Sequence, residues 1–167
     1  LHTDVTMSDE PDNQLTSKQF HRFEVFHGLT ADEVEQVAEC AELFRVEAGE
    51  EIMTEGARNR DLFGLMDGKV EVLKTGDSGD VTTVAELEAF AAFGELGLAV
   101  GAPRTATIRT LTPCRFLRID GETFQKLQSA RSDAAYKIEH NILRILAHRL
   151  ADANRELSKK GDGAYEL

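Results

Sequence analysis

Short apolar segments separated by turn-forming residues run from Leu43 to Ile119, and this pattern restricts the fold more than any other feature of the chain. Glycine, proline and Asp-Gly pairs interrupt the segments at short intervals, which predicts roughly seven or eight strands in a closed or double-sheet β structure. Asp67-Gly68 lies between two of the segments and predicts a type I′ hairpin, a turn that needs positive φ at both central positions. The segments are Leu43–Val46, Ile52–Met53, Leu62–Met66, Val70–Leu73, Val81–Ala85, Thr105–Thr110 and Arg115–Ile119.

Helical periodicity flanks this region on both sides. Thr30 and Glu33 follow an aromatic stretch and form a capping-box pattern, in which each side chain accepts from a free backbone N–H at a helix start. Asp120 and Ser132 are predicted to cap two C-terminal helices. The longer of these carries an apolar stripe that either packs along the β structure or is shared with a second chain. The stripe consists of Ile138, Ile142, Ile145, Leu146, Leu150, Ala153 and Leu157.

The chain is therefore predicted to be mainly β with flanking helices: a β-roll, or jelly-roll-like barrel, with N-terminal helices and a long C-terminal helix. One domain is expected over residues 16–158, between a flexible acidic tail at 1–15 and a second tail at 159–167. Its expected parts are N-terminal helices at 16–42, the β-roll at 43–119, which includes a distinct segment at 93–107, and C-terminal helices at 120–158.

The net charge of -11 disfavours binding to phosphate backbones and to anionic membranes. The five histidines show no zinc-ligand spacing, so no metal or cofactor is expected. Cys40 and Cys114 form no Cys-x-x-Cys motif, and two buried thiols of a cytoplasmic protein are favoured over a disulfide between them. No apolar run reaches the length of a membrane span and no N-terminal signal is evident, so a cytoplasmic location is predicted.

The segment from Phe93 to Thr107 contains the residues that most directly indicate a binding site. Gly94 to Ala99 is predicted to form one helical turn between two strands, and backbone N–H groups at the start of such a turn attract an anion. Arg104 can add a full positive charge in a planar fork, although taken alone it could equally pair with a carboxylate at the surface. Glu95 is a good acceptor for a sugar hydroxyl. Together these residues predict a pocket for a phosphate attached to a ribose.

At this segment the chain resembles the cyclic nucleotide-binding domain family of catabolite-activator regulators, cyclic-nucleotide-dependent kinases and cyclic-nucleotide-gated channels. The resemblance covers about residues 20 to 150, and its most specific parts are Phe93-Gly94-Glu95-Leu96 and Pro103-Arg104-Thr105-Ala106-Thr107. It implies that Arg104 pairs with the cyclic phosphate and that Glu95 accepts the ribose 2′-hydroxyl. The implied ligand-binding residues are Phe93, Gly94, Glu95, Leu96, Gly97, Arg104, Thr105 and Ala106.

The resemblance implies cAMP as the ligand, with cGMP as the alternative because the Thr105 hydroxyl could bond the exocyclic amine of guanine. The chain departs from the family at two positions. Ala89 stands at a turn position where the family usually has glycine, and Gly97 replaces a common alanine, which is expected to free the backbone of the phosphate cradle.

We expect a non-catalytic sensor that relays occupancy through its C-terminal helices to a protein partner that the sequence does not identify. Gly64 to Val70 is one residue short of a P-loop, and no nucleophile elbow or HExxH motif occurs, so no catalytic residue is assigned. Two alternatives remain open. One is a degenerate member of the fold that docks proteins, and the other is the sensor part of a transcription regulator. A homodimer through the long helix is compatible with each of them.

Overall fold

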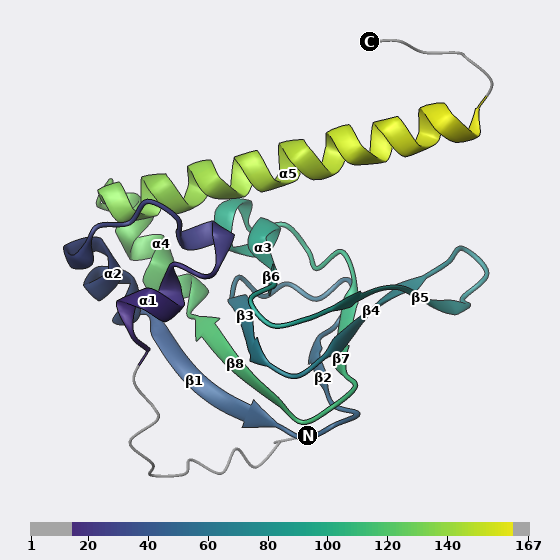
Figure 1. Cartoon of the computed structure of the whole chain (residues 1–167), viewed down its shortest axis with the longest axis horizontal. Coiled ribbons are helices and arrows are strands. Elements are labelled where there is room, and N and C mark those ends of the chain that lie inside the picture. Colours follow the sequence, from purple (N-terminus) through teal and green to yellow (C-terminus); the bar gives the residue numbers. More distant parts are fainter. Residues whose placement is uncertain (1–14, 162–167) are drawn as a thin grey trace.

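The computed structural model describes residues 15–161. The predicted tail at 1–15 lies outside the described residues except for Leu15, and so does the tail at 159–167 beyond Gly161. Two antiparallel sheets of four strands each lie below a layer of helices (Figure 1). The predicted β-roll with N-terminal helices and a long C-terminal helix is therefore confirmed.

The described residues contain eight strands and six helical segments. The strands are β1 (Ala41–Val46), β2 (Glu51–Met53), β3 (Leu62–Asp67), β4 (Val70–Thr75), β5 (Val81–Leu87), β6 (Ala92–Phe93), β7 (Thr107–Thr110) and β8 (Cys114–Ile119). The helices are α1 (Ser17–Phe20), the 3₁₀ turn η1 (Glu24–Phe26), α2 (Ala31–Ala38), α3 (Glu95–Val100), α4 (Gly121–Ser129) and α5 (Asp133–Lys160).

The strand order is β1-β8-β3-β6 in one sheet and β2-β7-β4-β5 in the other. An apolar cluster fills the space between the two sheets, because each sheet turns one face inward. Its buried members are Met53, Phe63, Leu65, Val70, Phe93, Ile108, Cys114 and Phe116. A second cluster lies between the first sheet and the helices, and includes Phe20, Phe26, Phe124 and Ile138.

The type I′ hairpin predicted at Asp67-Gly68 is wrong. β3 pairs with β6 and β8, whereas β4 pairs with β5 and β7, so the chain passes here from one sheet to the other. Gly68 has a φ of 98°, but Asp67 does not have the positive φ that a type I′ turn requires. The loop between β7 and β8 holds this connection between β3 and β4 instead: the N–H of Leu111 donates to the Lys69 carbonyl at 2.9 Å.

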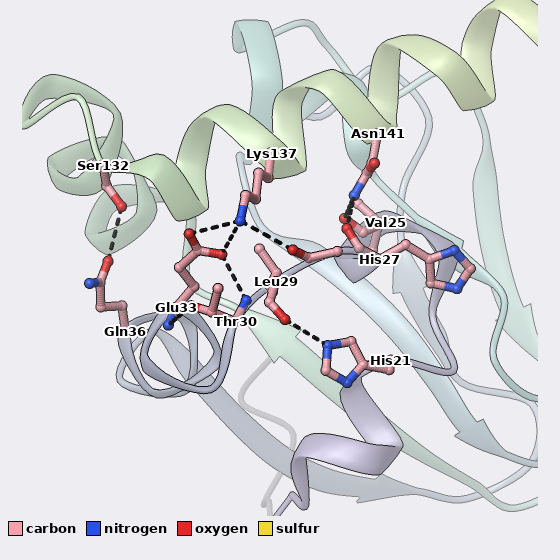
Figure 2. Close-up of polar contacts among 11 residues, drawn as sticks. His21, Val25, His27, Leu29, Thr30, Glu33, Gln36, Ser132, Lys137 and Asn141 are labelled. Atoms are coloured by element: carbon pink, nitrogen blue, oxygen red, sulfur yellow. Dashed lines mark hydrogen bonds and ion pairs between the residues drawn. The ribbon is translucent and has the colours of Figure 1, made fainter.

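Two of the three predicted helix caps are confirmed. Thr30 and Glu33 form a complete capping box at the start of α2, and the Asp120 carboxylate accepts from Thr123 N–H at the start of α4. Ser132 stands at the N-cap position of α5 but its hydroxyl does not cap the helix. That hydroxyl contacts the Gln36 side chain at 3.0 Å and so links α5 to α2 (Figure 2).

Polar contacts tie the first half of α5 to the N-terminal helices (Figure 2). Lys137 Nζ donates to both Glu33 carboxylate oxygens, at 2.9 and 2.8 Å, and to the Gly28 carbonyl at 3.2 Å. Asn141 Nδ2 donates to the backbone carbonyls of Val25 and His27, at 3.0 and 2.8 Å. The N-terminal helices and the beginning of α5 therefore form one packed unit beside the β-roll.

Candidate functional site

The short helix predicted within residues 94–99 is confirmed as α3, which lies between β6 and β7. Gly94 stands at its N-cap with a φ of 84°, a left-handed conformation that side chains other than glycine rarely adopt. A Cβ atom at Gly94 would lie 2.5 Å from Arg104 Nη1 and 2.8 Å from the Asp61 carbonyl oxygen. Glycine is therefore required here both by conformation and by the close approach of the arginine.

Arg104 lies behind the start of α3 with only 4% of its surface exposed. Its Nη1 donates to the Gly94 carbonyl at 3.1 Å. Its Nη2 donates to Asn59 Oδ1 at 2.9 Å and to the Asp61 carbonyl at 2.6 Å. All three acceptors are neutral, so the alternative of a surface arginine paired with a carboxylate is wrong.

Burial lowers the pKa of the Arg104 guanidinium because it removes the charged form from water, and the nearby charges of Asp61 and Glu95 oppose this shift. The group stays protonated, since an arginine does not lose its proton in a protein. The site therefore holds a buried cation whose charge no hydrogen-bonded anion compensates among residues 15–161.

Gly97 tightens the cradle, contrary to the expectation that it frees the backbone there. A Cβ at this position would lie 2.7 Å from the Asn59 carbonyl oxygen and 2.8 Å from Arg104 Nη1. Atoms that close cannot coexist without a shift of the backbone or of the guanidinium. The missing side chain therefore lets the loop that carries Asn59 pack against α3.

Glu95, the expected acceptor for a sugar hydroxyl, is engaged by the long helix. Its Oε1 forms an ion pair with Nη1 of Arg149, which lies in the second half of α5. The Glu95 side chain is 14% exposed and that of Arg149 is 58% exposed. Glu95 Oε2 makes no hydrogen bond with any residue that the structure describes. One carboxylate oxygen thus contacts α5 and the other remains available.

The space between α3, β2 and the start of β7 forms a small pocket. Six of the eight site residues expected from the sequence line it, together with Met53 and Pro103. The six are Gly94, Glu95, Leu96, Gly97, Arg104 and Thr105. The other two are buried: Phe93 stacks on Phe63 in the core between the sheets, and Ala106 is 7% exposed.

Three residues that shape this site were not identified from the sequence: Asn59, Asp61 and Arg149. They are separated from their partners by 45, 43 and 54 positions. No local pattern marks an asparagine in a loop or an arginine on a helix as the neighbour of so distant a residue. The glycines at 94 and 97, three positions apart, are the one local signal that another part of the chain approaches α3 closely.

Residues 15–161 hold neither a metal-ligand cluster nor a membrane-spanning helix. No group of three or more His, Cys, Asp or Glu side chains in that range converges as a metal site. No helix among the described residues is both long enough and apolar enough to span a bilayer. Cys40 and Cys114 are buried free thiols.

Comparisons with known proteins show which family the chain resembles in sequence and fold. Residues 43–131 match the protein-family model described as "Cyclic nucleotide-binding domain". A cAMP-dependent protein kinase regulatory subunit of Mycosarcoma maydis is 34% identical over 84 residues, which make up 50% of this chain and 16% of that protein.

Two solved structures are similar over most of the described residues. The catabolite activator protein of Thermus thermophilus superposes with a TM-score of 0.68 at 27% identity, over 80% of this chain and 61% of that one. The regulatory domain of Toxoplasma gondii PKA, crystallised with cAMP, gives a TM-score of 0.61 at 25% identity, over 65% and 41% respectively. The chain spans less than two thirds of the length of each of these relatives.

Proposed function

We propose that this chain, which belongs to the cyclic nucleotide-binding domain family, is a non-catalytic sensor that binds a 3′,5′-cyclic nucleotide in the α3 pocket and relays its occupancy through α5. The observation that carries the proposal is the buried Arg104, which lines the pocket and contacts only neutral acceptors. A buried charge without a counter-ion is unfavourable, so an anion bound against it is strongly favoured.

The ribose is assigned to Glu95. Its Oε2 has no hydrogen-bond donor among the described residues, and a carboxylate accepts well from a hydroxyl. Its Oε1 stays on Arg149, so a bound ribose and α5 would contact the same carboxylate. Backbone N–H groups of Leu96, Gly97 and Ala106 are proposed to complete the contacts with the phosphate, and the Phe93 ring to support the cradle from the core.

We propose cAMP as the preferred ligand and cGMP as the alternative. The relative from Toxoplasma gondii was crystallised with cAMP, which favours the first. Thr105 lines the pocket, and its hydroxyl makes no hydrogen bond with the described residues, which keeps it available for the amine of guanine.

The first experiment is calorimetric titration of protein that has been unfolded and refolded to remove any bound ligand. cAMP, cGMP and 5′-AMP are compared on the wild type, on Arg104→Ala, and on Arg155→Ala as a matched control at an exposed arginine of α5. We expect micromolar or tighter binding of a cyclic form. Arg104→Ala is expected to weaken it about 100-fold, since a buried charge contact is lost, and the control to leave it unchanged.

Circular dichroism and thermal unfolding of each variant show whether it is folded. Folded wild-type protein that binds no cyclic nucleotide better than 5′-AMP would overturn the proposal. That outcome would favour a domain that docks proteins.

The relay is assigned to the Glu95–Arg149 contact, the ion pair that joins the pocket to the second half of α5. Ligand that engages Glu95 changes the environment of Arg149, and α5 then shifts against the β-roll. Hydrogen exchange tests this step. Ligand should change amide protection in residues 143–156 of the wild type and of Arg155→Gln. In Arg149→Gln that change should be lost although the nucleotide still binds.

A second role for α5, formation of a homodimer, is supported by its exposed apolar residues. Tyr136, Leu143, Leu150 and Leu157 are spaced by seven residues and are between 64% and 69% exposed. A seven-residue apolar repeat is the pattern by which two helices form a coiled coil. Sedimentation velocity should show a dimer for the wild type and for the control Leu111→Lys, and a monomer for Leu150→Lys. A monomeric wild type would contradict this role.

We further propose a cytoplasmic protein whose described part contacts neither nucleic acid nor membrane. Two buried free thiols and the charge of -11 support this assignment. If the chain acts with a transcription regulator, we expect its partner or another segment to contact DNA, and a gel-shift assay with this chain alone should be negative.

A further inference from the structure

Asn59 is an exposed residue of the loop before β3 that contacts Arg104 but does not line the ligand pocket. Its Oδ1 accepts from Arg104 Nη2 at 2.9 Å and from the Asp61 backbone N–H at 2.7 Å. Arg104 lines the pocket, but neither Asn59 nor Asp61 does. Nη1, in contrast, is the nitrogen nearest to Gly94 and Gly97, which do line it. Asn59 therefore holds Nη2 of the guanidinium, while Nη1 lies against Gly94 and Gly97 at the pocket wall.

The atoms that hold Arg104 are neutral although a carboxylate is close by. Asp61 offers Arg104 its backbone carbonyl, whereas its carboxylate turns away: Oδ1 accepts from Gly121 N–H at 2.8 Å, and Oδ2 lies 3.7 Å from Arg118 Nη1. The amide of Asn59 occupies the position from which a carboxylate could pair with the guanidinium. An ion pair there would reduce the attraction of Arg104 for an anion on its other side.

We propose that Asn59 is a positioning residue for ligand phosphate: it orients the Arg104 guanidinium through a neutral amide, so that the full charge of the arginine stays available to the pocket. The inference rests on the proposed function and adds a determinant of affinity to it. Gly97 belongs to the same arrangement, because it lets the carbonyl of Asn59 approach α3.

Two substitutions separate orientation from charge. Asn59→Ala removes the acceptor and should weaken cyclic-nucleotide binding about three- to tenfold, the effect of one hydrogen bond. Asn59→Asp keeps the size and the acceptor oxygen but adds a negative charge, and it should weaken binding more than alanine does. A purely structural role predicts the reverse order, since aspartate preserves the hydrogen bonds. Asn154→Ala, at an exposed position of α5, is the matched control and should bind as the wild type does.

A second measurement is independent of nucleotide binding. In ligand-free protein, NMR of the ¹⁵N-labelled Arg104 side chain should show slow rotation of the guanidinium in the wild type and faster rotation in Asn59→Ala. Unchanged rotation would overturn the inference, and so would wild-type nucleotide affinity in Asn59→Ala. Failure of the proposed function can be told apart from failure of this inference, because the wild type itself would then bind no cyclic nucleotide. The NMR comparison would still decide the role of Asn59 in that case.

Discussion

The two halves of α5 have the same apolar periodicity but different surroundings. The first half buries Ala134, Ala135, Ile138, Asn141 and Ile142 against the N-terminal helices and the β-roll. In the second half every residue from 147 to 160 is exposed, and that part extends past α3 beyond the rest of the helical layer (Figure 1). The comparison shows that an apolar stripe predicts a helix and a face, but does not say what covers that face.

The ion pair between Arg149 and Glu95 lies near the boundary of the two halves. Helix α5 is thus anchored at its first half, held by one ion pair near its middle and exposed beyond that point. This arrangement is suited to transmit a small displacement along the helix. The predictions below test the anchored half against the exposed half, and begin with the largest expected effect.

Ile138→Ala should lower the free energy of unfolding by about 3 kcal/mol, because it leaves a cavity where a fully buried side chain packs in the core. Leu157→Ala, an equally apolar residue that is 67% exposed, should change it by less than about 0.5 kcal/mol at concentrations where the chain is monomeric. Urea denaturation measures both variants. Equal losses would show that the second half of α5 is buried in solution.

Asn141→Ala should lower the free energy of unfolding by about 2 kcal/mol, since the buried carbonyl of Val25 and the partly buried carbonyl of His27 lose their donor. Asn154→Ala makes the same chemical change in the exposed half and should have almost no effect. The same denaturation assay compares them. A negligible loss for Asn141→Ala would mean that water replaces the amide and that η1 is not anchored to α5 by this residue.

The pH dependence of stability should differ between the two halves. Hydrogen bonds from Lys137 and from the Thr30 N–H lower the pKa of Glu33 below its ordinary value. A carboxylate whose pKa is lower in the folded state stabilises the fold above its unfolded pKa of about 4.3. That contribution is lost as the pH falls through the folded pKa.

Lys137→Gln should therefore reduce the loss of stability on going from pH 6 to pH 3, which is measured by denaturation at each pH. Arg155→Gln, which breaks an exposed ion pair with Asp152 in the second half, is the control and should leave the pH profile unchanged. Identical profiles for wild type and Lys137→Gln would contradict the assignment.

The smallest effect on stability is expected for the contact at the boundary. Arg149→Gln and Glu95→Gln should each change the free energy of unfolding by less than about 1 kcal/mol, because the arginine is more than half exposed and water screens the pair. A double-mutant cycle of the two substitutions gives their coupling energy. A large coupling without ligand would show a static brace rather than a contact that ligand can shift.

Local features of the fold were predictable because the interacting residues are close in sequence. The capping box of Thr30 and the cap of Asp120 each join residues three positions apart, and α3 begins at a glycine that the segment itself supplies. The turn at Asp67-Gly68 was mispredicted for a related reason. A dipeptide determines where a chain bends, but the strands available for pairing determine which sheet the chain then joins.

The candidate site divides in the same way. Fewer than a dozen residues contain Gly94, Glu95, Gly97 and Arg104. The sequence alone therefore indicated an anion-binding turn with a cation and an acceptor for a hydroxyl. The sequence did not indicate that the arginine is buried among neutral acceptors or that the glutamate contacts α5. Both facts depend on where the loop at 57–61 and a helix more than 50 positions away come to lie.

The sequence by itself thus indicated the family, the succession of helical and strand regions, and a predicted binding segment at residues 93–107, because periodicity, capping and motif spacing are properties of neighbouring residues. Tertiary structure alone decided the assignment of β3 and β4 to different sheets, the surroundings of Arg104 and the division of α5 into a buried and an exposed half. The physical reason is that these features arise from the packing of the two sheets and the helical layer around shared apolar cores, which brings together side chains that no local pattern relates.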